Sequence, residues 1–315
     1  MTKIAIVGSG LIGRAWATIF ASHGFEVALH DVVPAAAKAA RAHIAKNLKE
    51  LAGYGLVADP KGSLARIRVA EDLADALKGV ALVQENGPET IEAKQALFAE
   101  MDRLAPKSAI LASSTSFIIA SRFSEGLAGR ARCLVAHPVN PPHLVPIVEL
   151  APAPWTDPKV VEKARKIYEK AGQVPILLKK EMPGFVLNRL QAVLLAEAFR
   201  IVGAGVASPQ DVDKTIKDGL GLRWSFMGPF ETIELNAPGG IPDYCARYGK
   251  SLNEMSPSAN GGNPFDQKTV DAIMANWGGA KSAEAVAALS NWRDGRLAAL
   301  KAHKKSAKPK PKIAG

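Results

Sequence analysis

The chain opens with Lys3-Ile-Ala-Ile-Val-Gly-Ser-Gly-Leu-Ile-Gly13, an apolar run followed by three glycines spaced Gly-x-Gly-x-x-Gly. The run has the length and composition of a buried strand. The residues that follow repeat apolar side chains at helical spacing, namely Ala15, Trp16, Ile19 and Phe20. A strand, a glycine-rich turn and a helix in this order are typical of a dinucleotide-binding unit.

Each of the three positions in the turn requires glycine for a different steric reason. Gly8 permits the tight turn, Gly10 lets the backbone approach a pyrophosphate, and Gly13 lets the helix pack closely on the strand. Leu11 and Ile12 lie in the same turn, just before the helix predicted over residues 14–23, whose N-terminus supplies partial positive charge to the phosphates. These five residues are the predicted phosphate-binding part of the site.

An acid follows at the distance expected for a ribose contact. The apolar run 25–30 predicts a second strand that ends at Asp31, eighteen residues after Gly13. A carboxylate there accepts hydrogen bonds from ribose hydroxyls and repels a 2′-phosphate. Val32-Val33-Pro34 places no arginine beside it. The sequence therefore predicts NAD rather than NADP. FAD is a lesser alternative, because flavin sites usually carry Glu here.

The rest of the first half alternates strands and helices. Apolar strands are expected at 80–83, 109–111 and 133–136, with helical stretches between them, and a hairpin-like pair at 145–150 and 174–178. This pattern predicts an α/β fold, a Rossmann-type doubly wound and mostly parallel sheet.

After Glu181-Met-Pro-Gly184 the sequence favours helices only. We therefore expect a NAD-binding Rossmann domain over residues 1–182. An all-helical C-terminal domain for substrate and dimerisation would follow over 183–300, and a disordered Lys/Pro tail over 301–315.

Composition bounds the class of protein. An apolar fraction of 48% and a charged fraction of 22% are ordinary for a globular domain. No signal peptide is evident, and no apolar run reaches membrane-spanning length. The two cysteines, Cys133 and Cys245, give neither a disulfide framework nor metal-ligand spacing. We expect a cytoplasmic protein with no membrane partner.

The net charge of +10 does not indicate nucleic-acid binding, because much of it lies in one short segment at the end of the sequence. Residues 301–315 hold six lysines and no acid, which leaves +4 for residues 1–300. A Lys/Pro/Ala segment of this kind has nothing to bury and is typical of a solubilising tail. We expect no nucleic-acid partner.

Four polar residues stand where a site should form. Ser116 follows the strand 109–111, His137 ends the strand that begins at Cys133, and Glu149 lies twelve residues further in another apolar run. Asn188 lies early in a long helical stretch. In open α/β sheets ligands bind beyond the carboxyl ends of the strands, so these side chains are the candidate catalytic set.

The set suits the removal of a proton from an alcohol. Histidine has an unperturbed pKa near neutrality, so His137 is the candidate general base, with Glu149 to orient it. A metal is not expected, since the prolines that surround His137 and His143 prevent a helical ligand face and no complete ligand set appears.

These motifs resemble one known family. The glycine turn, Ser113-Ser-Thr-Ser116, His137-Pro-Val-Asn-Pro141 and Gly184-Phe-Val-Leu-Asn-Arg-Leu190 resemble the L-3-hydroxyacyl-CoA dehydrogenase family over about residues 3–300. Within it, the runs 11–17, 135–142 and 219–232 are most similar to the lambda-crystallin/L-gulonate 3-dehydrogenase branch.

The resemblance implies NAD-dependent oxidation of a 3-hydroxyl group in a small-molecule hydroxy acid. It makes His137 the base, Glu149 its partner, and Ser116 and Asn188 the ligands of the substrate oxygen. Asn140 would support the site. Two further residues, Glu85 and Lys94, would lie near the cofactor, as would Ser116 and Asn140. It also implies a homodimer formed through the helical domain.

Arg223 bears on the substrate. It lies in Gly221-Leu-Arg-Trp224, where the acyl-CoA enzymes of the family tend to lack arginine. A guanidinium can hold a free carboxylate with two parallel bonds, whereas a thioester carries no such charge. This favours a free 3-hydroxy acid such as L-gulonate.

Several alternatives remain open at this point. The substrate could be a 3-hydroxyacyl-CoA of fatty acid metabolism such as 3-hydroxybutyryl-CoA, or carnitine. The chain could also be an NAD(H)-binding, crystallin-like structural protein. Ser116 could merely cap a helix, Glu149 could be a surface acid, Asn188 could bond to a loop, and Arg223 could pack on Trp224. A lysine-base hydroxyacid dehydrogenase is disfavoured, because Gly184 stands where that lysine belongs.

Overall fold

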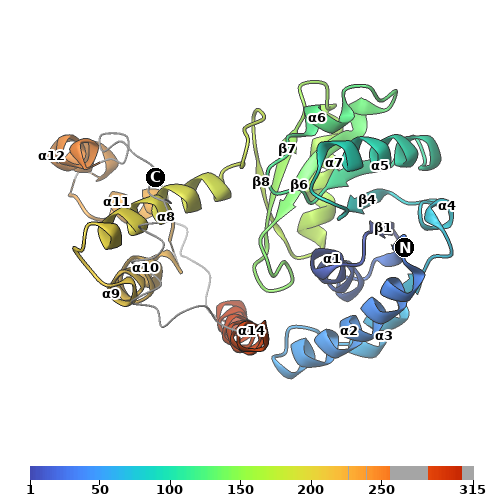
Figure 1. Ribbon diagram of the computed structural model, residues 1–315, viewed down its shortest axis with the longest axis horizontal. Helices are drawn as coiled ribbons and strands as arrows, with labels where there is room; N and C mark the ends of the chain where they lie inside the picture. The colour runs from blue at the N-terminus through green and yellow to red at the C-terminus, as the bar shows by residue number, and fades with distance from the viewer. Residues whose placement is uncertain (226, 239, 256–282, 307–315) are drawn as a thin grey trace. The chain divides into compact units, whose positions relative to one another are not determined.

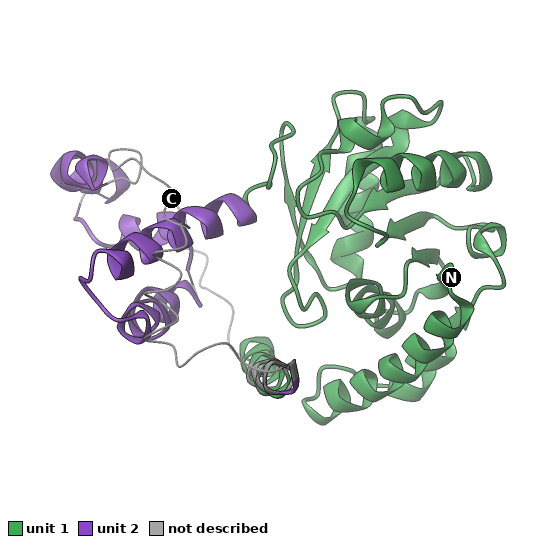
Figure 2. Ribbon diagram, in the orientation of Figure 1, with its two compact units in different colours: residues 1–186, 287–315 green, residues 187–286 purple. Residues whose placement is uncertain are grey.

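A computed structural model describes residues 1–225, 227–238, 240–255 and 283–306. The chain divides into two compact units (Figure 2). Unit 1 comprises residues 1–186 and 287–315, and unit 2 comprises residues 187–286. The residues after unit 2, from 287 onward, belong to unit 1 again. The sequence-based division at residues 182 and 300 did not predict this return.

Unit 1 is built on one eight-stranded sheet of order β3-β2-β1-β4-β5-β6-β7-β8. Neighbouring strands run parallel except for β6 and β7, which are antiparallel. The predicted Rossmann-type, mostly parallel sheet is confirmed. The strands are β1 Lys3–Val7, β2 Glu26–His30, β3 Ile67–Val69, β4 Leu82–Glu85, β5 Ile110–Ser113, β6 Cys133–Pro138, β7 Ile147–Pro152 and β8 Val174–Leu177.

Helices cover both faces of this sheet (Figure 1). Ile4 and Ile6 of β1 belong to a core cluster with α1 and α2, while Ala5 and Val7 pack in a second cluster with α5 and α6. Successive strand residues point to opposite faces, so two cores form. The helices before unit 2 are α1 Leu11–Ser22, α2 Pro34–Gly53, α3 Pro60–Ala65, α4 Leu73–Ala76, α5 Ile91–Leu104, α6 Ala120–Ser124, η1 Arg130–Arg132 and α7 Pro158–Lys170.

The predicted hairpin-like pair is wrong. β7 pairs with β8 in parallel, with Glu149 opposite Ile176. Helix α7 lies between the two strands in the chain, and a helical crossover returns a strand in the same direction. The antiparallel partner of β7 is β6 instead. The sequence analysis also missed β3, which has only three residues.

Unit 2 contains helices and no strand among the residues that the structure describes. They are α8 Leu187–Gly203, α9 Pro209–Lys214, η2 Thr215–Leu220, α10 Gly221–Trp224, α11 Pro229–Glu234 and α12 Gly240–Glu254. This agrees with the predicted helical C-terminal domain. None of the helices in the described ranges is both long and apolar enough to cross a membrane.

The last helix, α14, spans Ala283–Ser306. From residue 287 onward it belongs to unit 1, where the Lys301 amine donates to the His143 carbonyl at 2.7 Å. The expected disordered tail is therefore wrong for residues 301–306, which are helical. Lysine and alanine favour helix, and packing on unit 1 adds to that preference. Residues 307–315 of the predicted tail lie outside the described residues.

Candidate active site

The glycine turn joins β1 to α1 under tight steric limits. Gly8 has φ +92°, and a Cβ there would lie 2.6 Å from the Asn86 carbonyl oxygen. A Cβ on Gly13 would lie 1.9 Å from the Gly8 oxygen. By contrast, the space that a Cβ on Gly10 would enter is open. Gly10 is also the N-cap of α1 and offers no side chain to its N–H groups. The turn thus fits a pyrophosphate.

Asp31 stands next to this turn at the end of β2. Its Oδ2 accepts hydrogen bonds from the Ser9 backbone N–H at 2.8 Å and the Ser9 hydroxyl at 2.7 Å. Burial by itself would raise the pKa of Asp31, but the bonds from Ser9 and the Val33 N–H hold the pKa below its usual value. The carboxylate is therefore charged and oriented, as a ribose ligand must be.

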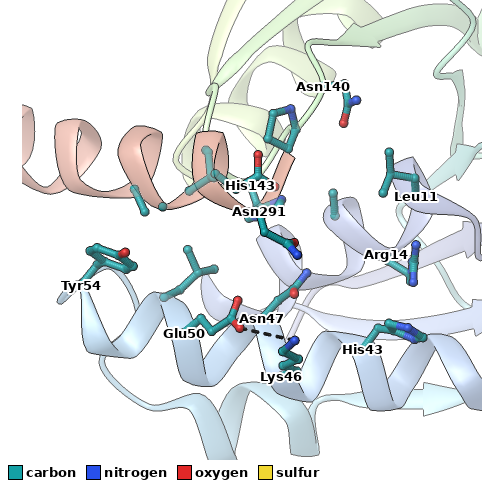
Figure 3. A pocket seen from close by; sticks show the side chains of 17 residues that line it. Leu11, Arg14, His43, Lys46, Asn47, Glu50, Tyr54, Asn140, His143 and Asn291 are labelled. Atoms are coloured by element: carbon teal, nitrogen blue, oxygen red, sulfur yellow. Dashed lines mark ion pairs between the residues drawn. The ribbon is translucent and has the colours of Figure 1, made fainter. Parts of the chain in front are cut away.

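A pocket of about 750 Å³ lies within unit 1 beside the turn (Figure 3). Four parts of the chain form its walls. They are the first turns of α1 from Leu11, the second half of α2, the loop from Asn140 to Leu144, and α14. Sequence reasoning did not find this pocket, because its walls come from segments far apart in the chain.

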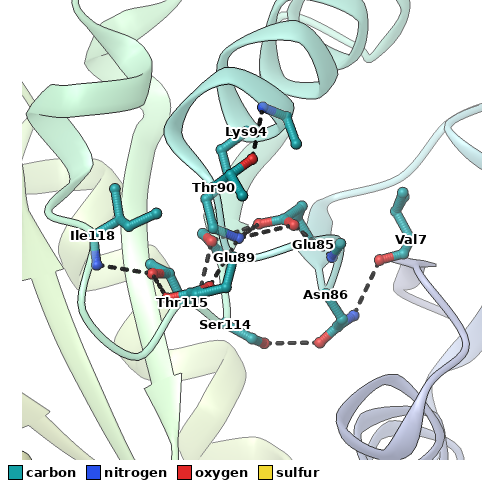
Figure 4. A network of polar contacts seen from close by, with 12 residues as sticks. Val7, Glu85, Asn86, Glu89, Thr90, Lys94, Ser114, Thr115 and Ile118 are labelled. Atoms are coloured by element: carbon teal, nitrogen blue, oxygen red, sulfur yellow. Dashed lines mark hydrogen bonds and ion pairs between the residues drawn. The ribbon is translucent and has the colours of Figure 1, made fainter.

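Glu85 and Lys94 form a buried ion pair rather than an open contact surface (Figure 4). The Lys94 amine lies 3.2 and 3.1 Å from the two Glu85 oxygens, and the side chains are 1% and 0% exposed. Glu85 also accepts from the Ser113 hydroxyl at 2.5 Å. The pair supports the loop after β4, and its predicted place near the cofactor stays a prediction.

Glu89 is a residue that the sequence analysis missed. Its Oε1 accepts hydrogen bonds from the Thr115 hydroxyl at 2.5 Å and the Ser116 N–H at 2.8 Å, and its Oε2 lies 3.4 Å from the Lys94 amine. Burial raises the pKa of Glu89, but Thr115 and Lys94 more than offset this, and the pKa is lowered. Glu89 thereby orders the turn that carries Ser116. Its position just before the Thr90 N-cap was the available signal.

His137 and Glu149 face each other across the β6–β7 ladder. They are directly opposite in register, and His137 Nδ1 lies 2.8 Å from Glu149 Oε2. Both are buried, with 4% of His137 and none of Glu149 exposed. The antiparallel strands bring together two residues twelve positions apart, as the apolar runs predicted.

This contact determines the state of the imidazole. A carboxylate accepts a hydrogen bond from Nδ1–H, so in the neutral ring the lone pair lies on Nε2. The other Glu149 oxygen, Oε1, accepts from the Val186 N–H at 2.8 Å. Phe185 packs on the imidazole with ring centroids 5.2 Å apart. The arrangement leaves Nε2 as the atom that can receive a proton.

The remaining predicted residues divide between the units. Asn140 is exposed and lines the pocket of unit 1. Asn188 is the second residue of α8, and Arg223 lies exposed in α10, both in unit 2. The predicted role of Asn140 toward the cofactor and those of Asn188 and Arg223 toward the substrate stay predictions.

The doubly wound sheet, the glycine turn with its acid, and a buried His–Glu pair are together typical of NAD-dependent dehydrogenases. The chain belongs to the 3-hydroxyacyl-CoA dehydrogenase family. The family's NAD binding domain matches residues 3–182, and its C-terminal domain matches residues 184–281.

Similar proteins agree with this membership. A lambda-crystallin homolog of Bos taurus is 44% identical over 95% of this chain and 95% of its own length. An L-carnitine dehydrogenase of Pseudomonas putida is 33% identical over 96% of this chain and 94% of its own. A solved 5-formyl-3-hydroxy-2-methylpyridine 4-carboxylic acid 5-dehydrogenase, an NAD⁺-dependent dismutase, aligns with TM-score 0.83 and 28% identity over 98% of this chain and 100% of that one.

Proposed function

We propose that this protein oxidises the 3-hydroxyl of a free 3-hydroxy acid to the 3-keto acid, with L-gulonate as the leading substrate. The observation that carries the proposal is the buried His137–Glu149 pair, which leaves Nε2 of the imidazole as a proton acceptor. The family, whose members include NAD-dependent dehydrogenases, supports the reaction type.

In the proposed reaction the hydroxyl O–H bond breaks and its proton passes to His137 Nε2. The C3–H bond breaks at the same carbon, which becomes a carbonyl carbon. NAD, when bound, would accept the hydride, which carries both electrons of the broken C3–H bond. Glu149 stabilises the imidazolium that forms, because its Oε2 lies 2.8 Å from His137 Nδ1. We assign Ser116 and Asn188 to the substrate oxygen.

Arg223 is proposed to hold the carboxylate of the acid. Its guanidinium is exposed in α10 and offers the planar donor pair that a carboxylate accepts. Replacing Arg223 by Met should raise KM for a free acid about tenfold or more and leave KM for a CoA thioester unchanged. Arg247→Met, an exposed arginine of α12, is the control. An unchanged KM for the acid would contradict the carboxylate role.

A substrate panel tests the function itself. L-gulonate, 3-hydroxybutyrate, carnitine and 3-hydroxybutyryl-CoA are each supplied with NAD, and reduction is followed by the absorbance of the reduced nicotinamide. We expect the largest kcat/KM with L-gulonate. A larger value with the thioester would favour a role in fatty acid metabolism, and a larger value with carnitine would favour the activity named for the Pseudomonas relatives. No turnover with any of them would favour an NAD(H)-binding structural role.

Two further properties are part of the proposal. We propose a homodimer formed through the helical domain and a cytoplasmic location. Light scattering during size-exclusion chromatography should give the mass of two chains, and a single-chain mass would overturn the dimer. Fractionation of the source cell should recover the protein in the soluble cytoplasmic fraction.

A further inference from the structure

We infer that the pocket between α1, α2, the 140–144 loop and α14 holds the hydroxyl-bearing end of the substrate. The inference rests on the proposed function and deepens it, because it names the substrate class as polyhydroxylated acids. It also makes α14 a specificity-determining element. The pocket lies wholly within unit 1.

The location of the pocket suits a substrate that reacts at His137. One wall includes Leu11, in the first turn of α1 after the glycine turn. Another includes Asn140, three residues after His137 in the chain. Three residues span at most about 10 Å of backbone. An acid whose 3-hydroxyl lies at the base can therefore extend its remaining carbons toward this pocket, and a volume of about 750 Å³ is typical of small-molecule sites.

The charges on the walls favour a neutral, polar occupant. Arg14 and Lys46 are opposed by Glu50 and Asp294, all of them lining residues. Burial lowers the pKa of His143 to about 4, so its ring is uncharged at neutral pH. The charges of these four lining residues cancel, so the walls offer no net attraction to a phosphate. Hydroxyl groups, which both donate and accept, match such mixed walls.

Several polar groups of the pocket have no partner of their own. Within the described part of the chain, no hydrogen bond involves the side-chain amides of Asn47 and Asn291. Nδ1 of His143 is buried without a hydrogen-bond partner. Figure 3 shows Asn47 on α2 and Asn291 on α14, pointing into the pocket from two walls. A buried polar group without a partner costs free energy, so a hydroxylated ligand would gain by bonding to His143 Nδ1. The half-buried Asn47 amide and the exposed Asn291 amide offer it further donors and acceptors.

Helix α14 supplies a wall that the family domains do not. The C-terminal family domain ends at residue 281, whereas α14 begins at Ala283 and contributes Asn291 and Asp294 to the pocket. The Lys301 amine holds the helix to the loop through the His143 carbonyl. The polar character of the pocket thus depends on an element outside the two matched domains.

The test uses the full-length enzyme and two acids that react at the same carbon. L-gulonate carries hydroxyls on its remaining carbons, and 3-hydroxybutyrate carries none. Asn47→Leu and Asn291→Leu should each lower kcat/KM for L-gulonate about tenfold or more, since each removes a hydrogen bond to a substrate hydroxyl. The values for 3-hydroxybutyrate and KM for NAD should change less than about threefold.

Asn253→Leu makes the same change on exposed α12 and should leave both acids unaffected. Asn291→Gln, which keeps the amide, should retain more L-gulonate activity than Asn291→Leu. Equal losses for both acids, or no loss with either, would overturn the pocket assignment while leaving the proposed function intact. A wild-type enzyme that oxidises 3-hydroxybutyryl-CoA but neither free acid would instead overturn the proposed function, and this inference with it.

Discussion

His137 is held in the tautomer with a free lone pair at Nε2 when a second group accepts a hydrogen bond from Nδ1–H. Glu149 does this at 2.8 Å, and Glu149 is itself held by the Val186 N–H. A buried carboxylate that loses its imidazole partner would bear an uncompensated charge. The two residues therefore act as a unit, and their replacements should not have additive effects.

Replacing His137 by Gln should reduce kcat by about 10²- to 10⁴-fold, because the proton acceptor is lost while the polar shape is largely kept. Glu149→Gln should reduce kcat less than His137→Gln does, since the base remains but no carboxylate fixes its tautomer. Steady-state kinetics gives kcat, and fluorescence titration with NADH gives the cofactor affinity, which should change little. A His137→Gln enzyme with wild-type turnover would refute the base assignment.

For individual residues, the sequence predicted the site best where a motif lies at the end of a strand. The spacing of His137 and Glu149 predicted that they meet, and the ladder brings them together. Glu89 was missed because its role depends on two separate turns meeting in space, the one before α5 and the one at Ser116. A single sequence carries no direct signal of such a meeting.

The elements of unit 1 are joined by a second buried ion pair, between α5 and the residue before β6. Arg132 Nη2 lies 2.6 Å from Asp102 Oδ1, and both side chains are under 10% exposed. Arg132 also donates to the Pro106 and Ala109 carbonyls at 2.6 and 3.1 Å. Burial raises the pKa of Asp102, but the bonds from Arg132 and the Gly129 N–H lower it overall.

The lowered pKa sets the pH dependence of stability. The pair's contribution is present above pH 3.8, the ordinary pKa of an Asp carboxyl, and is lost as pH falls through the lower folded value. Asp102→Asn should therefore lower the free energy of unfolding by about 3 kcal/mol at neutral pH, with a smaller difference in acid.

Urea unfolding at several pH values measures this effect. The surface pair Arg68–Asp75 provides the control, because Asp75 is 34% exposed and Asp75→Asn should cost less than about 1 kcal/mol. Similar losses for the two variants at neutral pH would contradict the importance of burial.

Element boundaries were predicted best where an apolar run and a turn signal agree, as in β1, whereas α1 begins at Leu11, three residues before its predicted start. β3 was missed because Ile67-Arg-Val69 is too short to show alternation. The hairpin prediction failed because two apolar runs do not reveal their relative direction, which depends on what lies between them. Residues 301–306 of the lysine-rich segment are helical because α14 packs on unit 1. Amino-acid composition alone does not reveal such tertiary packing.

For the whole molecule, cofactor selectivity should appear as a difference in thermal stability. NAD at one hundred times its Kd adds about 2.7 kcal/mol, which corresponds to a rise in Tm of roughly 5 °C. NADP at the same concentration should give a much smaller rise, because the charged Asp31 repels its 2′-phosphate.

In the Asp31→Ser variant, the rise in Tm with NADP should come closer to the rise in Tm with NAD. Differential scanning fluorimetry gives all of these Tm values. Equal shifts for NAD and NADP in the wild-type protein would contradict the role of Asp31.

The order of the two family domains along the chain was predictable from the change in sequence pattern near residue 182, but the return of the last helix to the first unit was not.

The antiparallel placement of β7 has a consequence for how such an enzyme can diverge. His137 and Glu149 are cross-strand neighbours, so their separation depends on ladder register and not on the loop that joins the strands. That loop, together with α14, lines the pocket. Insertions and substitutions in that loop can therefore reshape the pocket while the distance between His137 and Glu149 stays the same. The sheet thus separates the part of the molecule that is free to vary from the part whose geometry is fixed.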